Sequence, residues 1–332
     1  MIKLRNFSRG HVPVSSIGFG AAGIAGLYRE VPAKDANDTL QCAWDNGIRY
    51  FDTAPFYGHG LSERRVGDFL RQMPRNNYTL STKVGRLLRP ENAGPPPDHG
   101  FVGALPFRPD FDYSYDGVMR SFEDSLQRLG LSRIDVLYVH DIGQMTHGAN
   151  YPTYRCQLFT GGLRALDELR SSGAIKAVGL GVNEVPVCLE VMAEFDLDCI
   201  LLANRLTLLD RSAQPKLIGE CKRKGVSLVV GGVFNSGILA TGAVPGAHYE
   251  YGVAPEEIID RVRRLERVAG QHGIPLAAAA LQFPHQFEIT ASVLIGTAKT
   301  ESLLRNLALM DVNVSKTAWA DFNSALAFDS RK

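Results

Sequence analysis

Cysteine is scarce in this chain, and its positions are scattered. The 332 residues include five cysteines, an odd number, and no two of them form a C-x-x-C pair or a spacing typical of metal ligands. This pattern predicts reduced thiols rather than a disulfide framework, and it predicts no metal site. The five are Cys42, Cys156, Cys188, Cys199 and Cys221.

The chain also lacks an excess of either charge and any long apolar run. Lys and Arg number 36 against 35 Asp and Glu, so the net charge of +1 gives no field that attracts nucleic acid or an anionic membrane. No run reaches the roughly 18 apolar residues of a transmembrane helix, and the residues after Met1 do not resemble a signal peptide. We expect a soluble, cytoplasmic protein with no nucleic-acid or membrane partner. Nothing in the composition indicates its oligomeric state.

A glycine-rich dinucleotide fingerprint is missing as well. The glycine pairs Gly18–Gly20 and Gly179–Gly181 are too short to match G-x-G-x-x-G at the start of a helix. A nucleotide site of the Rossmann type is therefore not expected.

Short apolar runs, by contrast, alternate with amphipathic segments along almost the whole chain. The runs are apolar throughout, which is typical of parallel strands covered on both faces. Eight such units predict a (β/α)8 TIM barrel, a single domain over residues 1–332, with a doubly wound open sheet as the alternative. The expected strands are Ser16–Gly20, Ile48–Ala54, Tyr78–Val84, Ile134–His140, Ala174–Val182, Cys199–Arg205, Val226–Val233 and Ser292–Thr297. The expected helices are Asp35–Asn46, Ser62–Gln72, Tyr115–Leu129, Gly161–Ser172, Val185–Phe195, Ala213–Lys224, Glu256–Gln271, Leu276–His285 and Thr300–Leu309.

Four polar residues lie at or near the ends of these expected strands: Asp52, Tyr57, Lys83 and His140. Parallel strands would bring them to one end of the sheet. A phenol with a pKa near 10 is a poor base, but an adjacent cation lowers that pKa and a carboxylate holds the cation. We interpret Tyr57 as an acid/base tuned by Lys83 and Asp52, with His140 orienting the reacting oxygen during proton and hydride transfer. Taken one at a time, each of the four residues could have a structural role instead of a catalytic one, as a cap, an ion-pair partner or a buried ring.

Two long connections, Arg86–Tyr113 and Asp141–Thr160, follow strands that carry these residues. Long loops in compact domains are often functional, and both are rich in aromatic residues. We interpret them as walls of a substrate pocket, with ordinary surface excursions as the alternative. The expected substrate-binding aromatic residues are Tyr28, Phe56, Phe107 and Tyr154.

Three segments, Asp52–Gly67, Ser81–Gly85 and Val139–Asp141, together resemble the aldo-keto reductases, and the resemblance extends over nearly the full chain. It implies an NAD(P)-dependent (β/α)8 barrel in which the four polar residues have the roles given above. Further phrases, including Phe111–Ser121 and Phe234–Ala240, resemble the branch that contains D-threo-aldose 1-dehydrogenases and pyridoxal 4-dehydrogenase.

The branch implies oxidation of a cyclic hemiacetal to a lactone, with Tyr57 as the base on the anomeric hydroxyl. An aldose such as L-fucose or D-arabinose is slightly favoured as substrate over pyridoxal. A general NADPH-dependent aldehyde or ketone reductase stays open, as does a barrel that binds nucleotide in a regulatory role without catalysis.

The resemblance also implies that the cofactor lies across the carboxyl-terminal rim, near the loops after the seventh and eighth strands. Ordinary βα turns are the alternative for these loops. This chain has Val182, Ala203 and Gly231 at positions where the family usually carries other residues beside the nicotinamide ring. Phe234 is therefore a candidate surface for that ring. Because only Lys299 offers a positive charge in the eighth loop, we expect NAD to be preferred over NADP. The expected cofactor-binding residues are Gly20, Asp52, Asn183, Phe234, Asn235, Ser236, Gly237, Leu239, Gly296, Thr297, Lys299, Ser302 and Asn306.

Overall fold

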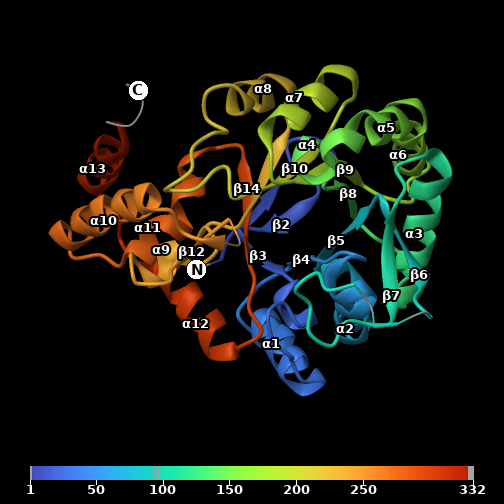
Figure 1. Ribbon diagram of the computed structural model, residues 1–332, viewed down its shortest axis with the longest axis horizontal. Coiled ribbons are helices and arrows are strands. Elements are labelled where there is room, and N and C mark those ends of the chain that lie inside the picture. The colour runs from blue at the N-terminus through green and yellow to red at the C-terminus, as the bar shows by residue number, and fades with distance from the viewer. Residues whose placement is uncertain (1, 93, 96, 251, 328–332) are drawn as a thin grey trace.

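Eight parallel strands close into a barrel in the computed structural model, which describes residues 2–92, 94–95, 97–250 and 252–327. Figure 1 shows the strands at the centre with helices around them. Neighbours follow chain order, and the last strand pairs with the first, so the barrel prediction is confirmed and the open-sheet alternative is wrong. The barrel strands are β3 (Ile17–Gly20), β4 (Tyr50–Asp52), β5 (Thr79–Val84), β8 (Val136–His140), β9 (Ala177–Val182), β10 (Cys199–Ala203), β11 (Ser227–Gly231) and β14 (Thr290–Ile295).

Amphipathic helices cover the outer face of the barrel, and all nine expected helices are present. Their buried faces are apolar, as in α3, where Val118, Phe122 and Leu129 pack inward. The helices are α1 (Ala33–Asp45), α2 (Leu61–Leu70), α3 (Tyr115–Leu129), α6 (Leu163–Ser171), α7 (Val185–Glu194), α8 (Leu217–Lys224), α10 (Glu256–Gln271), α11 (Leu276–Gln282) and α12 (Thr300–Ala308). A further helix that the sequence analysis did not predict, α13 (Lys316–Ala327), packs against α10.

The amino-terminal end of the barrel is closed by a hairpin of β1 (Leu4–Asn6) and β2 (Pro13–Ser15). Phe7 and Val12 belong to the same buried cluster as Val136, Ala177 and Cys199, which begin or lie near the start of their strands. This end is therefore filled by packed side chains. The opposite, carboxyl-terminal end is where Asp52 and His140 end β4 and β8.

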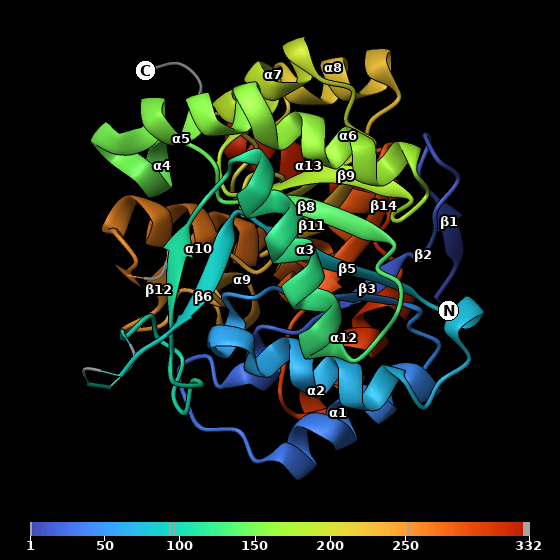
Figure 2. The same ribbon diagram turned by 90° about the vertical axis from the view of Figure 1, so that its right-hand side faces the viewer.

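The two long connections contain regular secondary structure. The first forms a hairpin of β6 (Arg86–Pro90) and β7 (Phe107–Phe111), seen beside α3 in Figure 2. The second is largely helical, with α4 (Gln144–His147), α5 (Tyr151–Gln157) and a π-helical turn at Leu158–Gly162 that continues into α6. Another short pair, β12 (His248–Tyr249) and β13 (Gly252–Val253), and the turn α9 (Ile238–Thr241) follow β11.

No helix within the described ranges is long and apolar enough to cross a membrane.

Candidate active site

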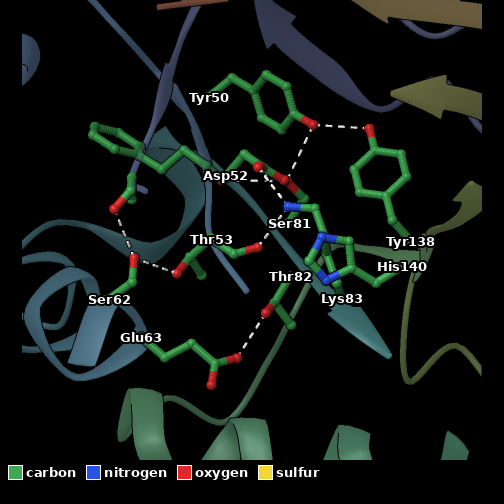
Figure 3. Close-up of polar contacts among 12 residues, drawn as sticks. Tyr50, Asp52, Thr53, Ser62, Glu63, Ser81, Thr82, Lys83, Tyr138 and His140 are labelled. Carbon is green, nitrogen blue, oxygen red and sulfur yellow. Dashed lines mark hydrogen bonds and ion pairs between the residues drawn. The ribbon is translucent and has the colours of Figure 1, made fainter. Parts of the chain in front are cut away.

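Asp52 and Lys83 form a buried ion pair inside the carboxyl-terminal end of the barrel. Lys83 Nζ donates to Asp52 Oδ2 at 2.7 Å and to the Thr53 carbonyl at 2.9 Å (Figure 3). The Lys83 side chain passes close to Gly181 of β9, where a Cβ atom would lie 3.3 Å from Lys83 Cε. A glycine at 181 therefore leaves the lysine room to reach its partner.

A chain of buried hydroxyl groups supports the other oxygen of Asp52. Ser81 Oγ donates to Asp52 Oδ1 at 2.7 Å and lies 3.1 Å from the Tyr50 hydroxyl, which in turn lies 2.8 Å from the Tyr138 hydroxyl. Figure 3 shows these groups joined in a continuous series of hydrogen bonds. Both carboxylate oxygens are thus engaged within the protein, so Asp52 acts on its neighbours rather than as a free acceptor.

Tyr57 lies farther from its strand than the sequence analysis expected. Five residues after the end of β4, it begins a 3₁₀ helix (Tyr57–Gly60) that turns the chain into α2. Lys83 Nζ lies 4.8 Å from the centroid of the Tyr57 ring. Burial raises the pKa of Tyr57 to about 12, and Lys83 opposes this rise without reversing it. Lys83 thus lowers this pKa, as expected from the sequence, but desolvation of the phenolate outweighs the attraction.

His140 faces Tyr57 from β8, with ring centroids 5.8 Å apart and planes nearly perpendicular. Its pKa is well below the usual 6.5, chiefly because of burial and further because of the positive charges of Arg86 and Lys83. The ring is therefore neutral at physiological pH and suited to hydrogen bonding.

Arg86, the first residue of β6, contacts His140 directly, and the sequence analysis did not single it out. The feature of the sequence that could have identified Arg86 as a site residue is its position three residues after Lys83.

A cavity of about 420 Å³ opens beside Tyr57, Lys83 and His140. Phe56 lines it as expected, and so does Tyr28, which is 65% exposed. His99 and Phe101 of the connection Arg86–Tyr113 and Asp141 of the connection Asp141–Thr160 also line it, in keeping with the interpretation of these connections as pocket walls. Leu27, Leu201 and Ala203 are further lining residues that were not expected there.

Two expected substrate contacts lie elsewhere. Phe107 begins β7 and pairs with Pro90 in the hairpin, away from the cavity lining. Tyr154 packs in an aromatic cluster with Phe111 and His147, its ring centroid 4.3 Å from that of His147. Periodicity alone does not distinguish an aromatic residue that packs in the core from one that lines a pocket.

A second, larger hollow of about 840 Å³ adjoins the first, and Leu27 and Tyr28 line both. It lies over the ends of β11 and β14, where the sequence predicts the cofactor. Its lining includes five of the expected cofactor-binding residues, namely Phe234, Asn235, Ser236, Gly237 and Gly296.

The donor and acceptor groups here fit a nicotinamide dinucleotide. Asn183, which lines the catalytic cavity, and Asn235, which lines the larger hollow, each have a buried side-chain oxygen with no hydrogen-bond partner among the described residues. Such groups are costly unless a ligand or water satisfies them. Asn235 and Ser236, which are not glycines, both have positive φ angles, a strained conformation of the kind found at ligand clamps.

The remaining expected cofactor residues do not line this hollow. Leu239 is 1% exposed and belongs to the hydrophobic core, where the turn α9 buries it. Asp52 lies in the buried ion pair with Lys83, and Asn183 lines the catalytic cavity. The other five lie in β3 or in the loop and helix that follow Gly296: Gly20, Thr297, Lys299, Ser302 and Asn306.

No cluster of three or more His, Cys, Asp or Glu side chains suited to a metal ion occurs in the described part of the chain.

Residues 16–327 match the aldo/keto reductase family. The chain belongs to this family. The match fits the closed barrel and the polar groups at its carboxyl-terminal end, and the protein is accordingly an NAD(P)-dependent oxidoreductase.

Two similar relatives are dehydrogenases. A pyridoxal 4-dehydrogenase of Microbacterium luteolum is 44% identical, with 96% of each chain covered, and a D-threo-aldose 1-dehydrogenase of Pseudomonas sp is 36% identical, with 94% of each covered. Among solved structures, the holo form of an aldo-keto reductase from Bacillus halodurans superimposes with a TM-score of 0.77 at 22% identity, covering 98% of this chain and 96% of that one. The branch suggested by the sequence is therefore confirmed.

Proposed function

We propose that this enzyme oxidises a cyclic hemiacetal to its lactone, and that the hemiacetal of pyridoxal is its substrate, giving 4-pyridoxolactone. The observation that carries the choice of substrate is the aromatic wall of the cavity beside His140, made by Tyr28, Phe56 and Phe101. The rings of Phe56 and Phe101 meet edge to face with centroids 5.6 Å apart. A planar pyridine ring fits such walls, since aromatic pairs favour stacked or edge contacts.

The polar groups of the cavity support the same choice. Lys83 is bonded to Asp52, His140 and Asp141 are bonded to Arg86, and His99 Nδ1 lies 3.1 Å from His59 Nε2. An aldose needs several partners for its hydroxyl groups, because buried donors and acceptors left unpaired are costly. Most polar groups here already have partners within the protein, which reverses the slight preference for an aldose that the sequence suggested.

The chemistry follows from the catalytic residues. Tyr57 would take the proton of the anomeric hydroxyl as the carbon–oxygen double bond of the lactone forms, while His140 donates a hydrogen bond to that oxygen. Tyr57 can accept this proton only as its phenolate. Lys83 would stabilise that phenolate, and Asp52 would hold Lys83 in place. The cofactor supplies an acceptor for the hydride that leaves the same carbon.

NAD is the cofactor we propose, with Asn183 and Phe234 beside the nicotinamide. In the loop after β14, Gly296 and Ala298 carry no charge. Lys299 directly precedes α12, and Glu301 follows in the first turn of that helix. A 2′-phosphate would gain few charge-assisted contacts there. We further propose that this single-domain enzyme acts in the cytoplasm.

An aldose remains the second candidate because of the relative that acts on D-threo-aldoses. Incubation with NAD⁺ and either pyridoxal, L-fucose or D-arabinose separates the two through the absorbance of the reduced nicotinamide. We expect the highest kcat/KM with pyridoxal and almost none for Tyr57→Phe. Turnover of no hemiacetal, together with rapid NADPH-dependent reduction of simple aldehydes, would instead identify a general carbonyl reductase.

A further inference from the structure

Arg86 is held beside the active site by its backbone and by two aromatic rings. Gly85, with φ +102°, turns the chain from β5 into β6, and a Cβ atom there would clash with the Tyr113 ring at 2.3 Å. The Arg86 guanidinium lies 4.1 Å from the ring centroid of Phe56 and 4.8 Å from that of Phe111. Only 6% of the residue is exposed, so its position is fixed by packing on both faces.

The guanidinium makes one polar contact with each of two adjacent residues at the end of β8. Arg86 Nη1 lies 3.1 Å from His140 Nδ1, and Arg86 Nη2 donates to Asp141 Oδ2 at 2.7 Å. A guanidinium has only donors, so His140 Nδ1 must accept and must carry no proton. The proton of the neutral ring is then on Nε2.

The charges around His140 favour the same neutral form. Lys83 and Arg86 are positive, whereas the Asp141 carboxylate lies 3.5 Å from His140 Nε2 and on its own would favour an imidazolium. Arg86 pairs with this carboxylate. The other titratable neighbours are Tyr57, whose ring meets His140 edge to face, and Tyr113, whose hydroxyl donates to the His140 carbonyl at 2.7 Å.

We propose that Arg86 is a positioning residue that fixes His140 as the neutral tautomer with its proton on Nε2. This inference rests on the proposed function, in which His140 donates a hydrogen bond to the reacting oxygen. A proton on Nδ1 would face the Arg86 donor and leave Nε2 without a hydrogen to donate. An imidazolium would also place a hydrogen on Nδ1 against that donor. Arg86 excludes both forms through a single contact.

Nitrogen NMR of the full chain labelled with [¹⁵N]histidine tests the proposal without any substrate. The His140 signals are assigned by their loss in His140→Gln. We expect the Nε2–H tautomer in the unmodified protein throughout the range of about pH 5 to 8, in which an ordinary histidine titrates. In Arg86→Met, which removes both the donor and the charge, His140 should titrate within this range or populate both tautomers. An Nδ1–H tautomer in the unmodified protein, or unchanged His140 signals in Arg86→Met, would overturn the proposal.

Kinetics with the proposed substrate provide an independent measurement. Arg86→Ala should lower kcat at least about tenfold with little change in KM, and added guanidinium ion should restore part of the loss. Arg89→Gln is the matched control, because Arg89 lies in the same strand with 41% of its side chain exposed and should keep full activity. A kcat loss without rescue and with an unchanged His140 tautomer would show that Arg86 merely supports the fold. If the unmodified protein turns over no hemiacetal, the proposed function fails while the NMR result still stands.

Discussion

Lys83 Nζ lies 2.7 Å from Asp52 Oδ2, and only 2% and 3% of the two side chains are exposed. Burial alone favours the neutral form of each partner, lowering the pKa of Lys83 and raising that of Asp52. For Lys83, its attraction to Asp52 and to Tyr57 outweighs the effect of burial, so the pKa of Lys83 ends above its usual value. The ammonium form of Lys83 is therefore favoured, and it places a positive charge beside Tyr57.

The pH dependence of oxidation should follow the Tyr57 phenol, because the base form is its phenolate. Burial raises the pKa of this phenol to about 12, so the phenolate fraction increases about tenfold for each pH unit below that value. We expect kcat/KM for pyridoxal oxidation to rise with pH from 7 to 10 without reaching a plateau. Steady-state rates with NAD⁺ across this range provide the measurement. A plateau that begins near neutral pH would show that Tyr57 titrates far lower than the structure indicates.

Removal of the Tyr50 hydroxyl should weaken the fold more than it weakens catalysis. Tyr50→Phe removes one hydrogen-bond partner from the Tyr138 hydroxyl and one from Ser81 Oγ, both of which are buried inside the barrel. Ser81 Oγ keeps its acceptors on Asp52 and on the backbone. Unpaired buried polar groups cost about 1–3 kcal/mol, so urea denaturation should show a loss of that size. Asp52 keeps its contact with Lys83, and kcat should therefore change little.

Tyr115→Phe is the matched control, since it removes a hydroxyl that bonds Glu168 at the surface of α3 and α6. It should leave the unfolding midpoint nearly unchanged. Equal losses for both variants would contradict a special role of the buried hydroxyl chain.

The four polar positions could be predicted because each belongs to or closely follows an apolar run, and a barrel brings the carboxyl ends of all its strands together. Asp52, Lys83 and His140 lie within their strands as expected. Tyr57 is displaced because the strand before it ends at Asp52 and a 3₁₀ turn begins at Tyr57 itself. The pattern located the strands well but their ends only to within a few residues.

Contacts made by the folded-back hairpin could not be predicted. Its tip pairs with the loop after β3 through an antiparallel bridge between Leu27 and Phe101, and this brings Phe101 and His99 to the cavity. The sequence of residues 86–113 shows no alternation that fixes where the hairpin lies. For the same reason Arg86 was not singled out from the sequence, and Phe107 was expected in the pocket.

Loss of the Phe101 ring should weaken substrate binding selectively. In Phe101→Ala the cavity loses the aromatic ring that meets Phe56 edge to face, and aromatic contacts of this kind contribute about 0.5–1.5 kcal/mol beyond their buried area. We expect the KM for pyridoxal to rise roughly two- to tenfold, with a smaller change in kcat. Phe107→Ala, in the same connection but outside the cavity lining, is the control and should leave KM unchanged. Equal KM values for the two variants would mean that the aromatic wall does not contact the substrate.

Removal of Arg128 should destabilise the protein strongly, because it leaves a buried carboxylate unpaired. Glu63 is fully buried in α2, where Arg128 Nε donates to one of its oxygens and Thr82 Oγ1 donates to the other at 2.6 Å. Breaking such a pair by removing one partner costs about 3–5 kcal/mol. Urea denaturation of Arg128→Met should show this loss.

Arg223→Met is the control for the Arg128 experiment. It breaks an exposed pair with Glu220 on α8, and such surface pairs contribute little to stability. The double variant Glu63→Met with Arg128→Met removes both charges and should recover part of the loss, because no unpaired carboxylate remains inside. If the double variant were less stable than Arg128→Met alone, the cost would come from lost packing between α2 and α3 rather than from the buried charge.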